Sequence, residues 1–366
     1  MRVMITCGGT GGHITPALAI ADVIKWNLPA AQILFVGTEG GMENAMVTAA
    51  GYAIKPLTVK GWQRGSGLSA LRALYLAEKG AREARRLIEA FRPDIVIGTG
   101  SYASYPALRA AAAMGIPAAV HESNAVPGLA VRLLAPRLDR IWLNFEAAGE
   151  GLREKERLLV VGNPLRQQSL AVTPAARPVG CDKMLLSFGG SLGADALNRA
   201  VVDMMKREAE VQGLYHLHAT GKRCYEGFLT QLHKAGLRES AGIRIVPFIT
   251  DMAAQMATAD VVISRAGAVS ISELAAMGKA AILIPSPNVT GNHQYKNAAA
   301  LAEKGAAVLL AESDLSGERL WQEVFSILSD EGKRKEMQRA IAAFARPDAG
   351  RQIFEDVLYL TGKKRA

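Results

Sequence analysis

A glycine-rich stretch near the start of the chain, Gly8–Gly12, most constrains the fold. It follows a short apolar run, Val3–Ile5, that is typical of a buried strand, and it precedes a helix-patterned segment that starts at Ile14 and tolerates Pro16 in its first turn. This order places bare backbone amides at the positive end of a helix, where an anionic or polyhydroxyl ligand can approach. A tight turn without a ligand has the same pattern, so this loop alone does not decide function.

The alternation of apolar runs and helix-patterned segments continues along the 366 residues. It predicts mostly parallel sheets with helices on both faces, and the length suggests two domains that each bury a core. Gly162-Asn163-Pro164 ends the first series, which predicts one domain over 1–162 and a second over 163–345, with Val172–Asp182 as a linker or loop. The predicted strands of the first domain are Arg2–Thr6, Gln32–Val36, Ala53–Thr58, Asp94–Gly98, Pro117–His121, Asp139–Trp142 and Arg157–Val161. Those of the second are Met184–Phe188, Leu214–Ala219, Ile243–Pro247, Asp260–Ser264, Ala280–Pro285 and Ala306–Leu310.

The two halves of the chain resemble each other at their loops. Asp94–Ser104 and Asp260–Ser270 both run from an apolar strand through small residues into a helix, and Pro117–Gly128 and Ala280–Gly291 form a second matched pair. The carboxyl ends of parallel strands lie at one edge of a sheet, where open α/β folds bind their ligands. We therefore expect an α/β protein of two Rossmann-like, doubly wound domains whose glycine-rich loops face one cleft.

Composition narrows the class of partner. The formal net charge of +9 suits phosphorylated substrates, an anionic membrane surface or nucleic acid, but aromatic residues make up only 6% of the chain, so no base-stacking surface and no nucleic acid are expected. Cys7, Cys181 and Cys224 are too few and too scattered for a disulfide framework or a zinc site. The chain enters a strand at once and has no apolar run of transmembrane length, so we expect a cytoplasmic protein.

One glycine motif of the first half is open to a cofactor interpretation. Gly98–Ala103 fits the dinucleotide pattern G-x-G-x-x-A, and Glu122 lies at a distance suited to a ribose contact. The motif belongs to a middle strand rather than to the first βαβ unit, which disfavours NAD. The chain has no Asp-x-Asp sequence, no P-loop and no metal-ligand spacing, so we expect neither a cofactor nor a metal.

The corresponding loop of the second half carries a clearer ligand-binding pattern. Small residues up to Ala268–Ser270 allow close backbone approach at a helix N-terminus, which stabilises a diphosphate. Glu273, about one turn later, can accept from both hydroxyls of a ribose, although Ser270 and Glu273 can also act only as helix caps. Further on, the amide of Gln294 suits sugar hydroxyls, and Arg166 can either reach a phosphate or be an ordinary surface residue.

A basic, apolar-tipped helix is predicted over Leu68–Phe91. Its apolar residues recur at helical spacing, as they do in a helix that packs on a core, and they are interleaved with basic residues. Such a helix also suits attachment to anionic lipid headgroups, so both interpretations stand for the first turns, whereas core packing explains the last turns. The residues assigned to the membrane interpretation are Leu68, Leu71, Leu74, Tyr75, Arg72 and Lys79.

Eight motifs together resemble the MurG family of bacterial peptidoglycan glycosyltransferases (glycosyltransferase family 28), and the resemblance extends over essentially the whole chain. The motifs are Gly8–His13, Gly98–Ser104, His121–Asn124, Gly162–Arg166, Gly189–Ala194, Phe248–Met252, Arg265–Glu273 and Gln294–Ala298. The resemblance implies a GT-B fold in which the last helix, about 346–366, packs back on the first domain. It also implies transfer of GlcNAc from UDP-GlcNAc to the C4 hydroxyl of the MurNAc of lipid I, an undecaprenyl-diphosphate acceptor. The transfer would proceed with inversion and give lipid II for peptidoglycan.

The resemblance further implies roles for individual residues. Of the candidate general bases in the first-half loops, His13, His121 and Glu122, it favours His13, with Glu122 as the competitor. Position 293 is His where some relatives carry Gln, which leaves the donor contact of His293 open. The implied donor contacts are Ile249 to the uracil, Glu273 to the ribose, Ser191, Ala268, Val269, Ser270 and Arg166 to the diphosphate, Gln294 and Asn124 to the sugar, and Thr10, Gly11 and Gly12 over the donor. Gly100 and Tyr102 are expected on the acceptor side.

The implied partners are UDP-GlcNAc, lipid I and an anionic membrane surface, together with cell-wall and division machinery. The implied location is the inner face of the cell membrane. Two other hypotheses stay open. A UDP-GlcNAc 2-epimerase or another GT-B glycosyltransferase would share the donor pocket, but the basic, apolar helix favours a lipid acceptor. A non-catalytic nucleotide-sugar-binding protein would not need Thr10, His13, Asn124 and Glu273 together.

Overall fold

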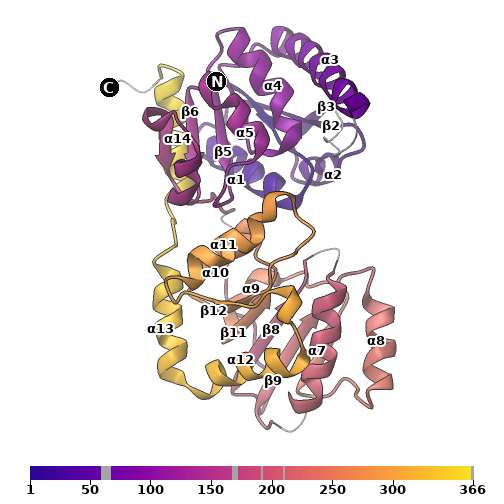
Figure 1. Cartoon of the computed structure of the whole chain (residues 1–366). Coiled ribbons are helices and arrows are strands. Elements are labelled where there is room, and N and C mark those ends of the chain that lie inside the picture. The colour runs from indigo at the N-terminus through magenta and orange to yellow at the C-terminus, as the bar shows by residue number, and fades with distance from the viewer. Residues whose placement is uncertain (59–66, 167–171, 191–192, 209–210, 364–366) are drawn as a thin grey trace. The chain divides into compact units, whose positions relative to one another are not determined.

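The chain divides into two compact units (Figure 1). The computed structural model describes residues 1–58, 67–166, 172–190, 193–208 and 211–363, without the side chains of 67–78 and of Thr290. Unit 1 comprises Met1–Arg166 and Arg346–Ala366, and unit 2 comprises Gln167–Ala345. The division therefore follows Arg166, whereas the sequence placed it after residue 162.

Unit 1 contains a parallel sheet of seven strands in the order β3-β2-β1-β4-β5-β6-β7. This order, with β1 and β4 at its centre, is that of a doubly wound sheet, as the sequence predicts. The strands are β1 (Arg2–Thr6), β2 (Gln32–Thr38), β3 (Ala53–Leu57), β4 (Ile95–Gly98), β5 (Ala118–Glu122), β6 (Arg140–Leu143) and β7 (Leu158–Val160). The helices are α1 (Gly11–Asn27), α2 (Met42–Ala49), α3 (Gly67–Phe91), α4 (Ser101–Ala113), α5 (Leu129–Leu134) and α14 (Ala349–Leu360).

Helices cover both faces of the unit 1 sheet, which explains why its central strands are continuous apolar runs rather than alternating ones. Met4 of β1 packs in one cluster with apolar residues of α3, α4 and α5. Val3 and Ile5, on the opposite face of the same strand, pack with residues of α1, α2 and α14. Ala84 and Ile88 are buried in the first cluster, which confirms that core packing explains the last turns of α3.

The C-terminal helix α14 completes the second layer of unit 1 although it lies far away in the sequence (Figure 1). Asp356 anchors it, because its Oδ2 accepts from Trp142 Nε1 at 2.8 Å and from Arg140 Nε at 2.9 Å. Gly350 lets the backbone of α14 approach α1, since a Cβ there would lie 2.8 Å from Val23. Unit 1 is therefore built from both ends of the chain.

Unit 2 contains a parallel sheet of six strands in the order β10-β9-β8-β11-β12-β13, again doubly wound. Residues of α7, α8 and α12 form a core on one face of this sheet. The strands are β8 (Lys183–Phe188), β9 (Leu214–Ala219), β10 (Ile243–Val246), β11 (Val261–Ser264), β12 (Ala280–Leu283) and β13 (Val308–Leu309). The helices are α7 (Asp195–Glu208), α8 (Tyr225–Lys234), α9 (Met252–Thr258), α10 (Ala268–Ala276), α11 (His293–Ala302), α12 (Gly317–Ser329) and α13 (Glu331–Ala342).

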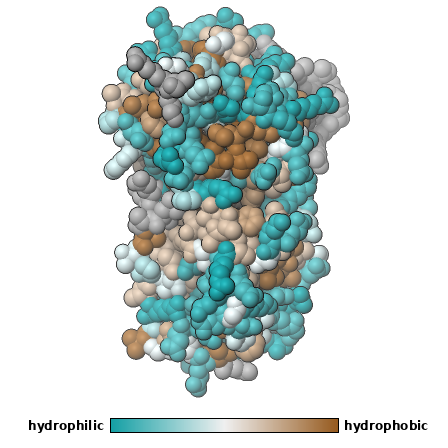
Figure 2. Space-filling view, turned by 90° about the vertical axis from the view of Figure 1, so that its left-hand side faces the viewer, coloured by the Kyte–Doolittle hydropathy of each residue, from teal (hydrophilic) through white to brown (hydrophobic). Residues whose placement is uncertain are grey.

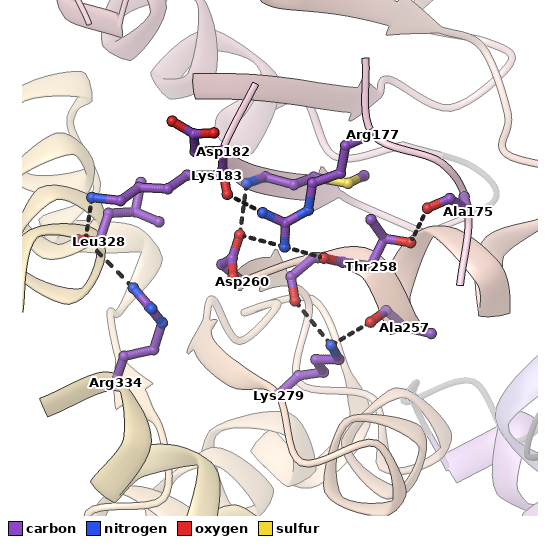
Figure 3. Close-up of polar contacts among 12 residues, drawn as sticks. Ala175, Arg177, Asp182, Lys183, Ala257, Thr258, Asp260, Lys279, Leu328 and Arg334 are labelled. Atoms are coloured by element: carbon purple, nitrogen blue, oxygen red, sulfur yellow. Dashed lines mark hydrogen bonds and ion pairs between the residues drawn. The ribbon is translucent and has the colours of Figure 1, made fainter. Parts of the chain in front are cut away.

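The segment that the sequence predicts as a linker is tied to unit 2 by a polar cluster (Figure 3). Figure 3 shows Arg177 pointing at Asp260, and the Nη2–Oδ2 distance is 3.0 Å. The same Asp260 oxygen accepts from the backbone N–H of Met184 at 2.8 Å, where β8 begins. Arg177 also donates to the carbonyl of Thr258, whose hydroxyl donates to the carbonyl of Ala175 at 2.9 Å. One carboxylate thus joins the segment before β8 to two strands.

Two helices begin earlier than their apolar patterns predict. The apolar pattern places the first helix at Ile14, but α1 begins at Gly11. After the strand Asp94–Gly98 the pattern predicts a helix over Tyr105–Met114, but α4 begins at Ser101. Apart from His13 and Tyr102, the added residues Gly11–His13 and Ser101–Ser104 are glycine or small residues, and the first amides of a helix have no partner within it. The hydrophobic period is absent from that turn because it faces the loops rather than the core.

The Asp260 contacts predict a stability effect. Asn at position 260 still accepts from Met184 N–H but loses the ion pair with the half-buried Arg177. We expect Asp260→Asn to lower the free energy of unfolding of unit 2 by about 1 kcal/mol, measured by urea unfolding followed by circular dichroism. Asp203→Asn is the matched control, since its ion pair with Lys206 is exposed on both sides. Equal stability of the two variants would contradict a role for the Asp260 cluster.

Candidate active site

In unit 1, two glycine-rich loops leave the sheet where its strand order reverses. β1 and β4 are neighbours there, and Thr6 pairs with Gly98 at their carboxyl ends. The loops that follow, Gly8–His13 and Gly98–Ser104, therefore lie side by side. Such a topological switch point is where open α/β sheets bind ligands.

Close packing between the two loops requires glycine at two positions. Gly9 and Gly100 have φ values of +85° and +83°, which L side chains rarely adopt. A Cβ on Gly100 would lie 3.1 Å from the His13 ring, and one on Gly9 would lie 3.6 Å from the Tyr102 ring. His13, Gly100 and Tyr102, which the sequence assigns to the site, thus lie together, next to the exposed Thr10 and Gly12.

His13 is oriented by the second loop. Its Nδ1 lies 2.7 Å from the carbonyl oxygen of Thr99, and the Thr99 hydroxyl donates to the His13 carbonyl at 2.7 Å. A carbonyl can only accept, so Nδ1 carries the proton and Nε2 of the neutral ring keeps its lone pair. This tautomer is the one that a general base requires.

Strand β5 ends with the competitor, Glu122. This carboxylate is buried, and both of its oxygens accept hydrogen bonds. Oε1 accepts from the backbone and side-chain nitrogens of Asn124 at 2.9 and 3.1 Å, and Oε2 accepts from the N–H of Gly128 at 2.9 Å. These contacts favour a role in shaping the loop and in orienting Asn124, so the geometry favours His13 as the base.

His121, the third candidate base, is fully buried. Its Nε2 donates to the carbonyl of Gly162 at 2.9 Å, and its Nδ1 lies 3.3 Å from the Ser123 hydroxyl. Burial, with repulsion from His13 as a smaller cause, lowers the pKa of His121 to about 4 despite the hydrogen bond to Gly162. His121 is therefore neutral at physiological pH and belongs to the structural support of the site.

The sequence analysis did not identify Glu43, whose carboxylate lies next to Gly8 of the first glycine-rich loop. This carboxylate is buried, and its Oε1 accepts from the N–H and the hydroxyl of Thr38 at 2.7 and 2.6 Å. A Cβ on Gly8 would lie 2.7 Å from the same oxygen. Burial, followed by the charge of Glu43, raises the pKa of the adjacent Cys7 thiol to about 12, so this thiol is unreactive. The only signal in the sequence is a glutamate in the first turn of α2, which is also common in exposed helix starts.

Arg166 does not belong to the unit that contains the other predicted diphosphate contacts. It groups with unit 1, where its Nε donates to Asp22 Oδ2 of α1 at 2.7 Å. The neighbouring Oδ1 of Asp22 accepts from the Tyr52 hydroxyl at 2.8 Å. The structure thus shows an ion pair at this position, and a phosphate contact by Arg166 stays a prediction.

In unit 2 the equivalent switch point lies between β8 and β11, where Phe188 pairs with Ser264. The glycine-rich loop after β8, Gly189–Ala194, and the start of α10 therefore leave the sheet side by side. Gly190 and Gly193 have φ values of +90° and +82°. Ser191, predicted to contact the diphosphate, lies outside the described residues.

The helix α10 presents its N-terminus without a side-chain cap. Its N-cap residue is Gly267, which has no side chain, and no side-chain hydrogen bond caps the helix. Ser270 and Glu273 are the third and sixth residues of the helix, so neither occupies the N-cap position. The first-turn N–H groups of Ala268, Val269 and Ser270 are thus directed out of the helix N-terminus, where the helix dipole stabilises negative charge.

A pocket of about 340 Å³ adjoins this helix. Glu273 lines it from α10, and Thr250 lines it from the loop that follows the buried Ile249. Glu273, predicted to contact the ribose, lines the pocket, and Ile249, predicted to contact the uracil, directly precedes the lining residue Thr250. The remaining lining residues are Val172, Asp251, Met252, Ala253, Ala254, Met256 and Met277.

Gln294 lies on the neighbouring edge of the same sheet, at the start of α11. Its Oε1 accepts from the backbone N–H of Ser286 at 2.9 Å, which leaves Nε2 as the donor end of the amide. Arg265, which sequence reasoning placed only within a motif, donates to the carbonyl of Pro285 at 3.3 Å and forms an ion pair with Glu312 at 2.5 Å. It ties the loop after β12 to the end of β11.

The predicted membrane helix is described only in part. The side chains of Leu68, Leu71, Arg72, Leu74 and Tyr75 lie outside the described residues, and the exposed Lys79 pairs with Glu83 at 3.8 Å. Figure 2 shows an apolar patch, surrounded by hydrophilic residues, on the upper half of the view, which is unit 1.

Within the described ranges, no helix is long and apolar enough to span a bilayer. The same part of the chain holds no cluster of metal-binding side chains.

Comparison with known proteins agrees with this geometry. Residues 3–143 match the glycosyltransferase family 28 N-terminal domain, and residues 184–353 match the family 28 C-terminal domain. A relative from Acetivibrio thermocellus is 39% identical over 100% of both chains, and one from Desulforamulus reducens is 41% identical over 98% of both. Both are named UDP-N-acetylglucosamine–N-acetylmuramyl-(pentapeptide) pyrophosphoryl-undecaprenol N-acetylglucosamine transferase.

Solved structures show the same architecture. The chain superposes on Acinetobacter baumannii MurG with a TM-score of 0.78 at 29% identity, covering 98% of this chain and 99% of that one. The UDP-GlcNAc 2-epimerase of Neisseria meningitidis shares the fold alone, with a TM-score of 0.67 at 13% identity over 98% and 100% of the two chains. Identity over the whole length, with both family domains in order, shows that the chain belongs to glycosyltransferase family 28, the family of the MurG transferases.

Proposed function

We propose that this chain transfers N-acetylglucosamine from UDP-N-acetylglucosamine to the C4 hydroxyl of the N-acetylmuramyl group of lipid I, with inversion. The observation that carries the proposal is the identity of 39–41% over essentially the whole length with relatives named for this transfer. The pocket at Glu273 and the uncapped start of α10 support it, because they suit a nucleoside and a diphosphate.

The proposed mechanism assigns the leaving group to unit 2. Glu273 accepts from the ribose hydroxyls, and the amides of Ala268–Ser270 hold the diphosphate at the positive end of α10. Their interaction strengthens as negative charge develops on the departing UDP, so it stabilises the transition state more than the bound donor. The donor end of the Gln294 amide suits a hydroxyl of the transferred sugar.

The proposed mechanism assigns the attacking group to unit 1. The carbonyl of Thr99 fixes the proton of His13 on Nδ1, so Nε2 takes the proton from the acceptor C4 hydroxyl. That oxygen then attacks the anomeric carbon as the bond to UDP breaks, which inverts the configuration. Thr10, Gly11 and Gly12 lie beside His13 and are proposed to close over the donor sugar.

The experiment that tests the function is detection of the product. The purified full chain is incubated with UDP-N-acetylglucosamine and a water-soluble lipid I analogue. Mass spectrometry is expected to show an acceptor heavier by one N-acetylhexosamine, and NMR a β linkage to C4. An unchanged acceptor together with consumed donor would contradict the transfer.

Glu273→Ala is expected to weaken UDP binding by about 10- to 100-fold. The change removes a charged acceptor of hydrogen bonds, which contributes about 1.5–3 kcal/mol. Isothermal titration calorimetry with UDP measures the effect. Glu331→Ala, on the exposed face of α13, is the matched control and should bind as the wild type does. A wild-type Kd for Glu273→Ala would remove Glu273 from the nucleoside site.

His13→Ala is expected to lower kcat by about 10²- to 10⁴-fold, the usual contribution of a general base, with the KM for UDP-N-acetylglucosamine within a few fold of wild type. Initial rates of UDP formation with the acceptor analogue measure both constants. His233→Ala, an exposed histidine on α8, serves as the control. If His13→Ala turns over at the wild-type rate, another group removes the proton.

We also propose that unit 1 binds the cytoplasmic face of the membrane, where the lipid acceptor resides. The net charge of +9 and the basic, apolar start of α3 support this location. Replacing Leu71, Leu74 and Tyr75 with Ser is expected to reduce cosedimentation with vesicles that contain anionic lipid severalfold. Val179→Ser, at a fully exposed position of unit 2, is the control. Undiminished vesicle binding by the triple variant would place the contact elsewhere.

A further inference from the structure

Five buried polar side chains in unit 2 form a continuous hydrogen-bonded chain that the proposed mechanism does not use. They connect β8 and β9 with the first and last turns of α7, and each of them is at most 5% exposed. The chain ends on the carbonyl oxygen of Thr220, just after β9. We call it the polar relay; its members, in order from that carbonyl, are Asn198, His218, Ser187, His216 and Glu208.

The Thr220 end sets the direction of the hydrogen bonds. Asn198 Nδ2 donates to the Thr220 carbonyl at 3.0 Å, so Asn198 Oδ1 faces His218 Nε2 at 3.2 Å. An amide oxygen only accepts, so Nε2 of His218 carries a proton. Burial, together with repulsion from His216, holds the pKa of His218 well below its ordinary value. The ring is therefore neutral, and its Nδ1 has no proton.

The hydroxyl of Ser187 determines which nitrogen of His216 carries a proton. Its hydroxyl lies 2.6 Å from Nδ1 of His218 and 2.6 Å from Nε2 of His216. A hydroxyl has one proton, which it donates to the bare Nδ1 of His218. It must then accept from His216, so Nε2 of His216 carries a proton as well.

The last two members of the relay, His216 and Glu208, hold one more proton between them. Nδ1 of His216 lies 2.8 Å from Oε2 of Glu208, and both side chains are 1% exposed. A bare ring nitrogen and a bare carboxylate at this distance would be two buried acceptors facing each other, which is costly. One proton therefore lies between them, and the pair has no net charge whether the proton is on His216 or on Glu208.

This polarity distinguishes the relay from a catalytic triad, which has the same residue types. In a Ser–His–Glu triad the serine donates to the histidine that faces the carboxylate. Here Ser187 accepts from that histidine, His216, and donates to His218. The hydroxyl is also fully buried, so it has no access to a substrate.

The relay reaches both described ends of the glycine-rich loop after β8, residues 189–190 and 193–194. Ser187 lies one residue before the end of β8, which leads into the loop. Asn198 follows the loop in the first turn of α7, where its N–H donates to the Ala194 carbonyl at 2.8 Å. The Thr220 carbonyl that Asn198 holds is packed against Gly193, where a Cβ would overlap it.

We propose that the polar relay positions Gly193, Ala194 and the start of α7 for a nucleoside diphosphate, with Asn198 as the positioning residue and one proton retained between His216 and Glu208. The choice of ligand rests on the proposed function, whereas the proton positions rest on the relay alone. A carbonyl, an amide, a hydroxyl and two rings can satisfy one another in only this direction, so the start of α7 and the Thr220 carbonyl against Gly193 are held in one arrangement.

The proton positions are tested by ¹⁵N NMR of the histidine rings in the full wild-type chain at neutral pH. We expect His218 as the Nε2–H tautomer with a bare Nδ1, and His216 with a protonated Nε2 and a proton bound to, or shared at, Nδ1. In Glu208→Gln the amide donates to His216, so Nδ1 of His216 should lose its proton while the tautomer of His218 stays the same. A His218 ring protonated on Nδ1, or a bare Nε2 on His216, would overturn the relay.

The positioning role is tested by UDP binding, measured by calorimetry. Asn198→Asp removes the donor to Thr220, and we expect the Kd for UDP to rise about tenfold, as for the loss of one buried hydrogen bond. Asp203→Asn, on the exposed side of α7, should bind UDP as the wild type does. A folded Asn198→Asp protein with a wild-type Kd would overturn the positioning role.

Two further outcomes are informative. If Asn198→Asp does not fold, Asn198→Ser, which retains a hydroxyl donor, is expected to restore folding with a raised Kd, and a wild-type Kd would again overturn the role. If the wild-type chain binds no UDP, the proposed function fails, while the ring tautomers still decide the relay.

Discussion

Parallel pairing at two central strand pairs is the constraint on which the site depends. Thr6 beside Gly98 in unit 1, and Phe188 beside Ser264 in unit 2, bring two strand ends together where the strand order reverses. Each pair places two small-residue loops side by side at a helix N-terminus, so that amides rather than side chains form the surface. The functional side chains, such as His13 and Glu273, then lie at the ends of these loops or in the helices that follow them.

Hydrogen bonds from buried polar side chains order the loops at these strand ends. Glu43 supports the first loop of unit 1, Glu122 shapes the loop after β5, and the polar relay reaches the first loop of unit 2. Loops rich in glycine lose much conformational entropy on folding, so fixed contacts below them are needed to order them. The hydrogen bonds that these groups make are costly to break, because a lost partner leaves a buried acceptor or donor alone.

The sequence predicts the two doubly wound sheets because their buried strands are continuous apolar runs with glycine at their ends. It also predicts that His13, Gly100 and Tyr102 belong to one site, since motifs at adjacent strand ends must meet. It does not predict the partners of a charged group: Arg166 pairs with Asp22, 144 residues away in the sequence, and Glu122 binds its own loop. The sequence also does not predict that α1 begins at Gly11, because a first turn that faces a loop has no apolar period.

The central claim is that UDP leaves only when an acceptor hydroxyl is present to replace it. The most direct measurement is UDP release from UDP-N-acetylglucosamine by the purified chain, with and without a lipid I analogue. The account predicts release that depends on the analogue and matches it one to one. Release at an equal rate without the analogue, as a hydrolase would give, would contradict the account.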